Sequence, residues 1–208
     1  MNLLLLGATG RVGHRFLELA SRTDHRVTAL VRDASRLPKG LGPRVRVLTG
    51  NVLEPGLVQR TLHDERYDAV VNVLGGGLAR SSLVTDSTRL AAEAMRTEGV
   101  SRYAGISVLT LMPATVPGRV TAAVLGSTFL RHVDHDHHGA LEALRQSDLD
   151  WVMVACGKID DGPGGAPLTR AERFPGGYRA IDTGDVAREL WRELETPEHH
   201  RAAVGVWA

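Results

Sequence analysis

The stretch that decides the fold is "MNLLLLGATGRVGHRF" at residues 1–16, in which four leucines lead directly into three spaced glycines. The leucines form a continuous apolar run of strand length, which is typical of a strand buried on both faces of a sheet. From Arg11 onward, apolar side chains recur on one helical stripe, so a helix is expected directly after the glycines. A strand, a glycine-rich turn and a helix in this order are typical of a site for a dinucleotide.

Each of the glycines Gly7, Gly10 and Gly13 has a separate expected role. Gly7 supplies the backbone freedom of a tight turn, Gly10 lets a pyrophosphate approach the backbone, and Gly13 lets helix and strand pack closely. The helix N-terminus then offers unpaired N–H groups and a partial positive charge to phosphates. A glycine turn without a ligand is the alternative, and the flanking strand and helix favour the phosphate site over it.

The rest of the chain alternates between strand-like and helix-like segments. Strands are expected at 26–31, 44–48, 68–75, 101–109 and 150–156, and helices at 11–22, 51–63, 82–98, 137–147 and 185–194. This order predicts an α/β fold, a doubly wound Rossmann-type parallel sheet with helices on both faces, as a single domain over residues 1–208. Two long irregular stretches, 108–135 and 156–180, follow strands of the second half. We therefore expect them to form the substrate side at the carboxyl edge of the sheet.

Composition excludes several other classes of protein. The 208 residues carry 25 basic and 24 acidic side chains, for a net charge of +1, which gives no case for a nucleic-acid or anionic-membrane surface. A single cysteine excludes an internal disulfide and favours a reducing compartment. No apolar run approaches the roughly 20 residues that a membrane span requires. A cytoplasmic protein is therefore expected.

The residues that follow the second expected strand indicate which nucleotide is bound. Arg32 falls about 20 residues beyond the glycines, and Asp33 comes next. A carboxylate at this place would accept a hydrogen bond from a ribose 2′-OH, whereas a guanidinium would hold a 2′-phosphate. Since Arg32 comes first, and Arg11 and Arg36 add positive charge nearby, the sequence predicts NADP(H) rather than NAD(H). The alternative is a solvated surface arginine.

Seven stretches together resemble a known group of proteins. They are "LLLLGATGRVG", "ALVRDASRLP", "VLTGNVLEPGLV", "DAVVNVLGG", "EGVSRYAGIS", "DHHGALEALRQSDLDWVMV" and "IDTGDVAREL". In this order they resemble the atypical short-chain dehydrogenase/reductase family with an NAD(P)H-binding domain, of the biliverdin reductase B and flavin reductase type, with NmrA-like proteins as cousins. The resemblance covers nearly the whole chain and specifies cofactor binding better than substrate.

The resemblance assigns residues to the adenosine half of the cofactor. The residues expected to wrap the pyrophosphate are Thr9, Gly10, Arg11 and Val12. By the same resemblance Arg32 takes the 2′-phosphate. Asn51 and Val52 flank the adenine, although the family more often has Asp at position 51.

The resemblance also assigns residues to the nicotinamide half. Leu74, Gly75 and Gly76 are expected to follow the cofactor toward the nicotinamide. Ser107, at the end of the fifth strand, is expected near the nicotinamide ribose and is a candidate catalytic residue. His137 matches a position that is often polar in the family, which makes it the first candidate for proton donation or substrate orientation; a plain histidine near a helix start is the alternative.

The chain departs from ordinary short-chain dehydrogenases at the catalytic pair. Those enzymes use Tyr-x-x-x-Lys, in which the lysine lowers the tyrosine pKa for proton transfer. The residues four positions after Tyr67, Tyr103 and Tyr178 are valine, serine and aspartate, so the pair is missing. Two further departures are Val108, where the family often has a second hydroxyl residue, and Cys156-Gly157 at the end of the sixth strand. Hydride transfer remains possible because the cofactor supplies that chemistry. Flavins and quinones take a proton from water and need no dedicated acid.

Four histidines crowd one short stretch, "RHVDHDHHG". His132, His135, His137 and His138 invite a metal site, but no HExxH-type frame is present, so the composition alone is weak evidence. We expect a helix start there instead, with Asp136 as its N-cap, and no metal. Cys156 is expected to be a buried inert thiol.

These observations predict an NADP(H)-dependent oxidoreductase that transfers hydride to a small conjugated acceptor, such as a flavin or quinone. One alternative is an NmrA-like redox sensor that binds NADP(H) without turnover. Another is a biosynthetic isomerase or cyclase on the same fold. The expected partner is a small-molecule substrate, with no nucleic acid and no membrane, and the sequence leaves monomer and homodimer open.

Overall fold

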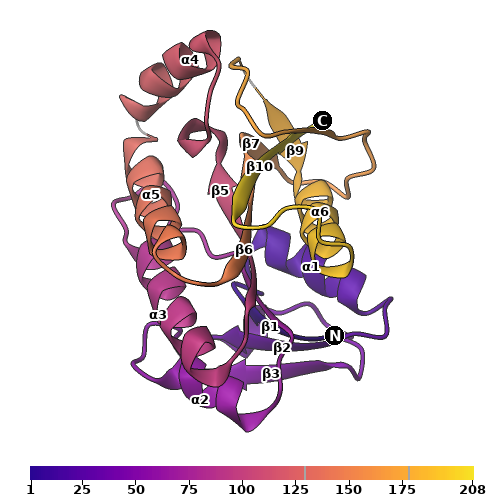
Figure 1. Ribbon diagram of the computed structural model, residues 1–208. Helices are drawn as coiled ribbons and strands as arrows, with labels where there is room; N and C mark the ends of the chain where they lie inside the picture. The colour runs from indigo at the N-terminus through magenta and orange to yellow at the C-terminus, as the bar shows by residue number, and fades with distance from the viewer. Residues whose placement is uncertain (129, 178) are drawn as a thin grey trace.

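The computed structural model describes residues 1–128, 130–177 and 179–208, and its helices flank one large sheet (Figure 1). The strands are β1 (Asn2–Leu6), β2 (Arg26–Val31), β3 (Val45–Thr49), β4 (Ala69–Asn72), β5 (Arg102–Val108), β6 (Asp150–Cys156), β7 (Lys158–Asp160), β8 (Thr169–Ala171), β9 (Ala180–Asp182) and β10 (Ala202–Trp207). The helices are α1 (Arg11–Ala20), α2 (Leu57–Asp64), α3 (Leu83–Glu98), α4 (Val116–Gly126), α5 (Arg131–Arg145) and α6 (Thr183–Glu195), with 3-10 turns η1 (Ala34–Arg36) and η2 (Leu109–Leu111). Tyr178, one of the three tyrosines tested for the catalytic pair, lies outside the described residues.

The large sheet has eight strands in the order β3-β2-β1-β4-β5-β6-β10-β8. All neighbouring pairs are parallel except β10 with β8. The chain runs outward from β1 to β3 and then returns to the other side of β1 with β4. This reversal places a switch point between the carboxyl ends of β1 and β4, where ligands bind in open α/β sheets. The predicted Rossmann-type α/β fold is confirmed.

The leucine run forms β1, in which all five residues are buried. Successive side chains alternate between the two faces of a strand. Leu3 and Leu5 therefore join the core beneath α1 and α6, while Leu4 and Leu6 join the core beneath α2, α3 and α5. A strand that must fill a core on both sides has no polar position, which explains the uninterrupted apolar run.

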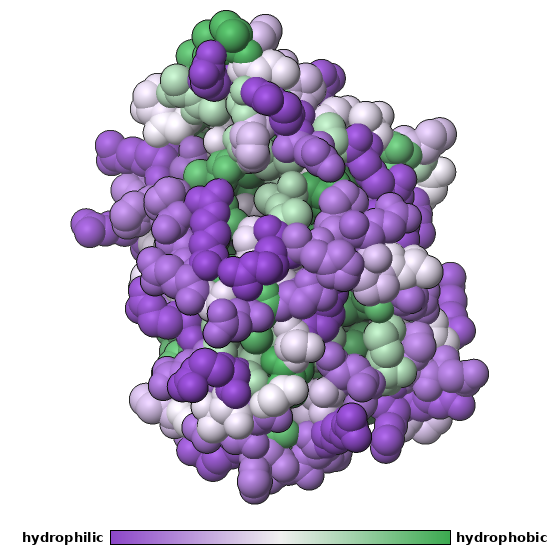
Figure 2. Space-filling model, viewed as in Figure 1, coloured by the Kyte–Doolittle hydropathy of each residue, from purple (hydrophilic) through white to green (hydrophobic). Residues whose placement is uncertain are grey.

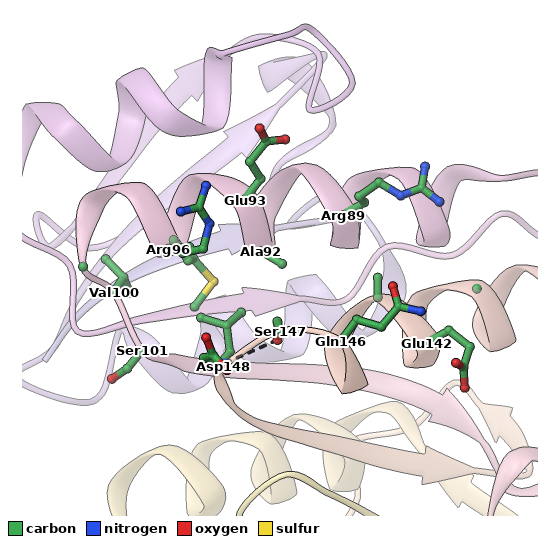
Figure 3. Close-up of a pocket in the computed structure, with 15 residues that line it drawn as sticks. Arg89, Ala92, Glu93, Arg96, Val100, Ser101, Glu142, Gln146, Ser147 and Asp148 are labelled. Carbon is green, nitrogen blue, oxygen red and sulfur yellow. Dashed lines mark hydrogen bonds between the residues drawn. The ribbon is translucent and has the colours of Figure 1, made fainter.

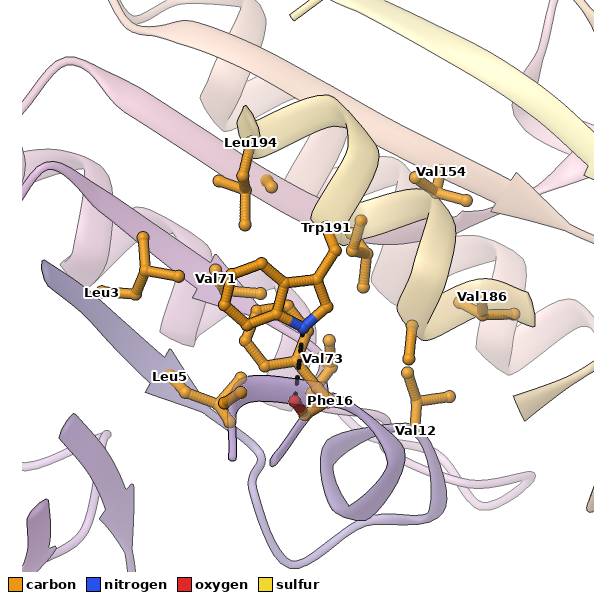
Figure 4. Packing of buried hydrophobic residues seen from close by; sticks show 14 of the residues in the cluster. Leu3, Leu5, Val12, Phe16, Val71, Val73, Val154, Val186, Trp191 and Leu194 are labelled. Carbon is orange, nitrogen blue, oxygen red and sulfur yellow. Dashed lines mark hydrogen bonds between the residues drawn. The ribbon is translucent and has the colours of Figure 1, made fainter. Parts of the chain in front are cut away.

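The helix that follows the glycines is anchored by α6, which lies beside it on the same face of the sheet (Figures 1 and 4). Phe16 of α1 stacks on Trp191 of α6, with ring centroids 4.6 Å apart and planes 14° from parallel. The Trp191 Nε1–H also donates a hydrogen bond to the Phe16 carbonyl oxygen at 3.3 Å. This contact fixes the position of α1, and with it the first turn of the chain.

The expectation that 108–135 is irregular is wrong. The stretch contains η2, α4 and the first turn of α5, and Thr115 caps α4 by accepting a hydrogen bond from the Gly118 N–H at 3.2 Å. Apolar side chains of α4 face outward, with Val116, Val120 and Val124 58–65% exposed, and Figure 2 shows hydrophobic residues gathered over this helix. An amphipathic pattern therefore gives no sign of α4. Within the described ranges, no helix has the length and apolar character that crossing a membrane requires.

The two stretches expected on the substrate side form one unit through backbone hydrogen bonds. The Thr115 N–H donates to the Phe174 carbonyl at 3.0 Å, and the Phe174 N–H donates to the Pro113 carbonyl at 2.8 Å. A Cβ on Gly118 would lie 2.1 Å from the Phe174 carbonyl oxygen, so only glycine permits this approach. The second stretch also carries the short strands β7, β8 and β9.

Candidate functional site

The first turn of the chain brings two predicted cofactor segments together. Gly7 has φ +92°, in the left-handed region that favours glycine, and a Cβ there would lie 2.8 Å from the Leu74 nitrogen. A Cβ on Gly13 would lie 2.3 Å from the Gly7 carbonyl oxygen. Gly13 therefore allows the close approach of helix to strand that the sequence predicts.

The N-terminus of α1 points unpaired donors at this turn. The Gly10 N–H donates to the Gly7 carbonyl at 3.0 Å, but within the described part of the chain nothing accepts a hydrogen bond from the N–H groups of Arg11, Val12 or Gly13. Gly10 is the N-cap and provides no side-chain cap, and the first turn of α1 holds no acidic residue. Unpaired donors together with the positive end of the helix dipole form a site for an anion.

The guanidinium of Arg32 is available at the end of β2, whereas the neighbouring carboxylate is occupied. Arg32 is exposed, and its side chain has no hydrogen bond or ion pair with any residue in the described ranges. Asp33 accepts hydrogen bonds from the Ser35 hydroxyl at 2.7 Å and the Ser35 N–H at 3.0 Å, as the cap of η1. These bonds hold the pKa of Asp33 below its usual value. Asp33 is thus held in a local turn, whereas the guanidinium of Arg32 has no partner in the described part of the chain.

Asn51 and Val52 lie at the carboxyl edge next to Arg32. The Gly50 N–H donates to the Val31 carbonyl at 2.8 Å, which holds the end of β3 beside the end of β2. Asn51 is exposed and its Oδ1 accepts from the Leu53 N–H at 3.1 Å, while Val52 is buried. Asn51 and Val52 therefore lie beside the end of β2, which Arg32 follows.

The segment after β4 runs from the first turn toward α5. Asn72 Oδ1 accepts from the Leu74 N–H at 3.1 Å and so shapes the start of the segment. A Cβ on Gly75 would meet open space, whereas one on Gly76 would lie 3.1 Å from the Asp136 carboxylate. Leu74 and Gly76 therefore connect the first turn of the chain with α5.

Ser107 lies near the end of β5, and His137 of α5 packs against the neighbouring residue of that strand. Ser107 is buried, and among the described residues its hydroxyl has no hydrogen-bond partner. The ring of His137 lies against the backbone of Ile106, and its buried Nδ1 is likewise without a partner in the described ranges. Burial lowers the pKa of His137, although Asp136, the Ile106 backbone and Asp134 act in the opposite direction. His137 of α5 therefore lies against β5 one residue before Ser107, and each side chain has a polar atom without a partner among the described residues.

Other side chains with reactive groups are closed to chemistry. Tyr103 is fully buried with its hydroxyl 3.1 Å from the Thr88 hydroxyl, and burial raises its pKa to about 12. The Tyr67 hydroxyl donates to Thr28 at 3.0 Å and is also buried. Burial raises the pKa of the Cys156 thiol to about 12, so it is not a nucleophile at neutral pH.

The expectation that Asp136 caps its own helix is wrong. Helix α5 begins at Arg131, five residues earlier, and the Asp136 carboxylate instead accepts hydrogen bonds from the N–H groups of Val84 and Thr85 at the start of α3. No local pattern distinguishes a cap of one's own helix from a cap of a neighbouring helix. The sequence analysis therefore missed this link.

The four histidines do not gather around one point. They lie along α5, and His137 alone among them is buried. Within the described ranges, three donor atoms close enough to share a metal occur only at Glu193, Glu198 and His199.

A groove of about 610 Å³ lies between α3 and α5 (Figure 3). Its lining includes Gly99, Val100 and Ser101, which lead into β5, and Asp148 and Leu149, which lead into β6. The groove is therefore at the amino ends of these strands. The glycine turn after β1, Arg32 after β2 and Ser107 near the end of β5 lie at the opposite, carboxyl edge, where the fold places ligands.

Comparison with known proteins identifies the family. The sequence model described as NAD(P)H-binding matches residues 7–197. The uncharacterized protein YwnB of Bacillus subtilis is 31% identical over 211 residues, which cover 96% of this chain and 94% of that protein. ChuY, an anaerobillin reductase from Escherichia coli O157:H7, is similar in structure, with a TM-score of 0.81 and 21% identity over 100% of this chain and 97% of its own. A short-chain dehydrogenase/reductase from Veillonella parvula in complex with NADP has a TM-score of 0.78 and 17% identity over 100% of this chain and 94% of its own.

Proposed function

Because this chain belongs to the NAD(P)H-binding family, we propose that it is an NADP(H)-dependent oxidoreductase, which transfers hydride between the nicotinamide and a small conjugated acceptor such as a flavin or quinone. One observation carries the proposal. The unpaired N–H groups at the start of α1 and the unpartnered guanidinium of Arg32 lie at the same edge of the sheet. Together they match a pyrophosphate and a 2′-phosphate.

The glycine turn at residues 7–13, called the phosphate turn below, binds the cofactor through the backbone. The N–H groups of Arg11, Val12 and Gly13 donate to the pyrophosphate, and the dipole of α1 stabilises its charge. Thr9 and Gly10, directly before these residues, surround the rest of the pyrophosphate. Arg11 also donates a hydrogen bond to the Ile159 carbonyl at 3.1 Å, which ties the phosphate turn to the strand that follows β6.

The choice of NADP(H) over NAD(H) rests on Arg32 and Asp33. Arg32 pairs with the 2′-phosphate through charge-assisted hydrogen bonds. Asp33 is occupied by Ser35 and is not available to a ribose 2′-OH. Arg36 adds positive charge in the same turn. Asn51 and Val52 then flank the adenine on the far side of Arg32.

The substrate half of the site lies beyond Gly75 and Gly76. When bound, the cofactor supplies the hydride, and the protein supplies orientation and a site shielded from water. Ser107 and His137 orient the acceptor or the nicotinamide ribose through their unsatisfied polar atoms. The segments 108–135 and 156–180 form the substrate side, and the proton of the reduced acceptor comes from His137 or from water.

The test is oxidation of NADPH by the purified protein with a panel of flavins and quinones, followed at the nicotinamide absorbance band. We expect acceptor-dependent loss of NADPH with at least one member of the panel. Tight NADPH binding without oxidation by any acceptor would favour the redox sensor. Absence of binding would favour the isomerase or cyclase.

A further inference from the structure

Arg179 is a half-buried cation with an unsatisfied hydrogen-bond donor. Its guanidinium carbon lies 5.2 Å from the centre of the Trp207 ring, and Trp207 is 8% exposed. The buried Nε of Arg179 has no hydrogen-bond partner within the described ranges. The aromatic face orients the guanidinium, but it satisfies none of its N–H donors.

Arg179 is the only arginine of similar burial in the described chain that has no carboxylate partner. The others are paired with carboxylates: Arg15 with Glu18, Arg102 with Asp150 and Glu193, Arg188 with Asp185, and Arg192 with Glu189. Neither a side-chain carboxylate nor the Ala208 terminus pairs with Arg179 among the described residues. A charge removed from water without a partner is costly, so an anion that arrives with a ligand would be favoured there.

Arg179 lies at the carboxyl edge of the sheet. Its carbonyl accepts a hydrogen bond from the Lys158 N–H at 2.9 Å, just beyond β6, and a Cβ on Gly157 would lie 2.3 Å from the same oxygen. Gly157, which directly follows β6, therefore permits the backbone of Arg179 to pack against it. The Ala208 N–H donates to the Ala180 carbonyl, which also holds the end of β10 beside this segment.

The strand register relates this cation to the candidate catalytic serine. Ser107 lies opposite Ala155, and Ala155 lies opposite Gly205. Trp207 follows Gly205 by two residues, so it faces the same side of the sheet as Ser107. Ser107 of β5 and Gly205 of β10 are two strand spacings apart, which is about 10 Å.

We propose that Arg179, held over Trp207, forms a subsite that binds an anionic group, a carboxylate or a phosphate, on the conjugated acceptor. This inference rests on the proposed function, because it adds the charge of the substrate to the same site. The planar guanidinium donates paired hydrogen bonds to either anion. The acceptor therefore places its conjugated ring near Ser107 and its anionic arm toward β10.

Two matched pairs of acceptors test the subsite. Flavin mononucleotide and riboflavin share one ring system and differ by a phosphate, and an anthraquinone carboxylate and its methyl ester differ by a carboxylate charge. Binding of each compound to the protein with NADP⁺ is measured by fluorescence or calorimetry, and kcat/KM is measured with NADPH. We expect at least one anionic member to bind about tenfold or more tightly than its neutral partner. If only one of the two pairs shows the preference, the anion of that pair, phosphate or carboxylate, is the group that the subsite binds.

Arg179→Met keeps an apolar stem over Trp207 and removes the charge, so it should abolish the preference while binding neutral members normally. Arg179→Lys should retain part of the preference. Arg66→Met, at an exposed arginine outside both substrate-side segments, is the control and should behave as the wild type. Unchanged NADP⁺ affinity and thermal unfolding establish that the variants fold.

Two results would overturn the subsite: no anion preference in the wild-type protein, or an equal preference in Arg179→Met. If the wild-type protein oxidises NADPH with none of the acceptors, the proposed function is wrong instead. An anion preference that persists in binding under that outcome, and that Arg179→Met abolishes, would still support the subsite.

Discussion

The carboxylate of Asp136 in α5 accepts a hydrogen bond of 2.8 Å from the backbone N–H of Thr85, 51 residues earlier at the start of α3. The Val84 N–H donates to the same carboxylate at 3.2 Å, and the Thr85 hydroxyl donates to the Asp136 carbonyl at 2.6 Å. Ser82, the N-cap of α3 by position, provides no side-chain cap. One helix therefore satisfies the free donors of another, next to both Gly76 and His137.

Replacement of Asp136 should destabilise the protein. Asp136→Ala leaves two buried or half-buried N–H groups without an acceptor, and hydrogen bonds to a charged group contribute about 1.5–3 kcal/mol. We expect a loss of that size in the free energy of unfolding, measured by urea denaturation, and a smaller loss in Asp136→Asn. Asp148→Ala, at an exposed aspartate, is the control. Equal stability of Asp136→Ala and this control would show that the cap contributes nothing.

The pH dependence of stability should reveal the buried His137. Its pKa is lowered in the folded state, so between the unfolded value of about 6.5 and the folded value the unfolded chain binds the extra proton. The contribution of neutral His137 is therefore complete above pH 6.5 and is lost as the pH falls, by at most about 1.4 kcal/mol per pH unit. His137→Asn should give a flatter curve of unfolding free energy below pH 6.5. Superimposable slopes in the two proteins would contradict the burial of a neutral ring.

Close packing at the first turn leaves no room for a side chain at Gly13. In Gly13→Ala the new Cβ would lie 2.3 Å from the Gly7 carbonyl oxygen, so α1 must shift away from the sheet. Overpacking of this kind costs about 1–3 kcal/mol, and the displaced N–H groups should also bind NADPH more weakly. Thermal unfolding and a binding titration measure the two effects. Gly75→Ala, whose Cβ meets open space, should unfold as the wild type does; a similar loss in both variants would mean that local packing is not the cause.

Much of this fold could be predicted because the governing signals are local. Within sixteen residues, the apolar run of β1 predicts a strand buried on both faces, and the glycine spacing predicts a helix packed closely against it. The same locality explains what was missed. Helix α4 is mostly apolar and turns Val116, Val120 and Val124 toward solvent, so it lacks the polar outer face by which a surface helix is predicted. Strand β10 was not predicted.

Part of the candidate site could be predicted from local sequence, and part could not. The residues of the phosphate turn are contiguous, and their arrangement follows from one strand and one helix. The link from Asp136 to Thr85 and the position of Arg179 over Trp207 depend on tertiary packing between distant segments, which spacing in the sequence does not encode.

Arg32 should discriminate between the two nicotinamide cofactors. Arg32→Ala removes a charge-assisted contact to the 2′-phosphate and should weaken NADPH binding by about 1.5–3 kcal/mol, or roughly ten- to a hundredfold in Kd. NADH binding should change little. Arg22→Ala, at another exposed arginine near α1, is the matched control. An equal loss for both cofactors in a titration would refute the assignment of the 2′-phosphate to Arg32.

The most direct test of the central claim is calorimetric titration of the purified protein with NADP⁺, NADPH, NAD⁺ and NADH. The N–H groups at the start of α1 and the guanidinium of Arg32 have no partner among residues 1–128, 130–177 and 179–208. They predict saturable one-to-one binding, with the 2′-phosphorylated cofactors bound more tightly. If the folded protein takes up none of the four, the first turn is a structural glycine turn and the proposed function is wrong.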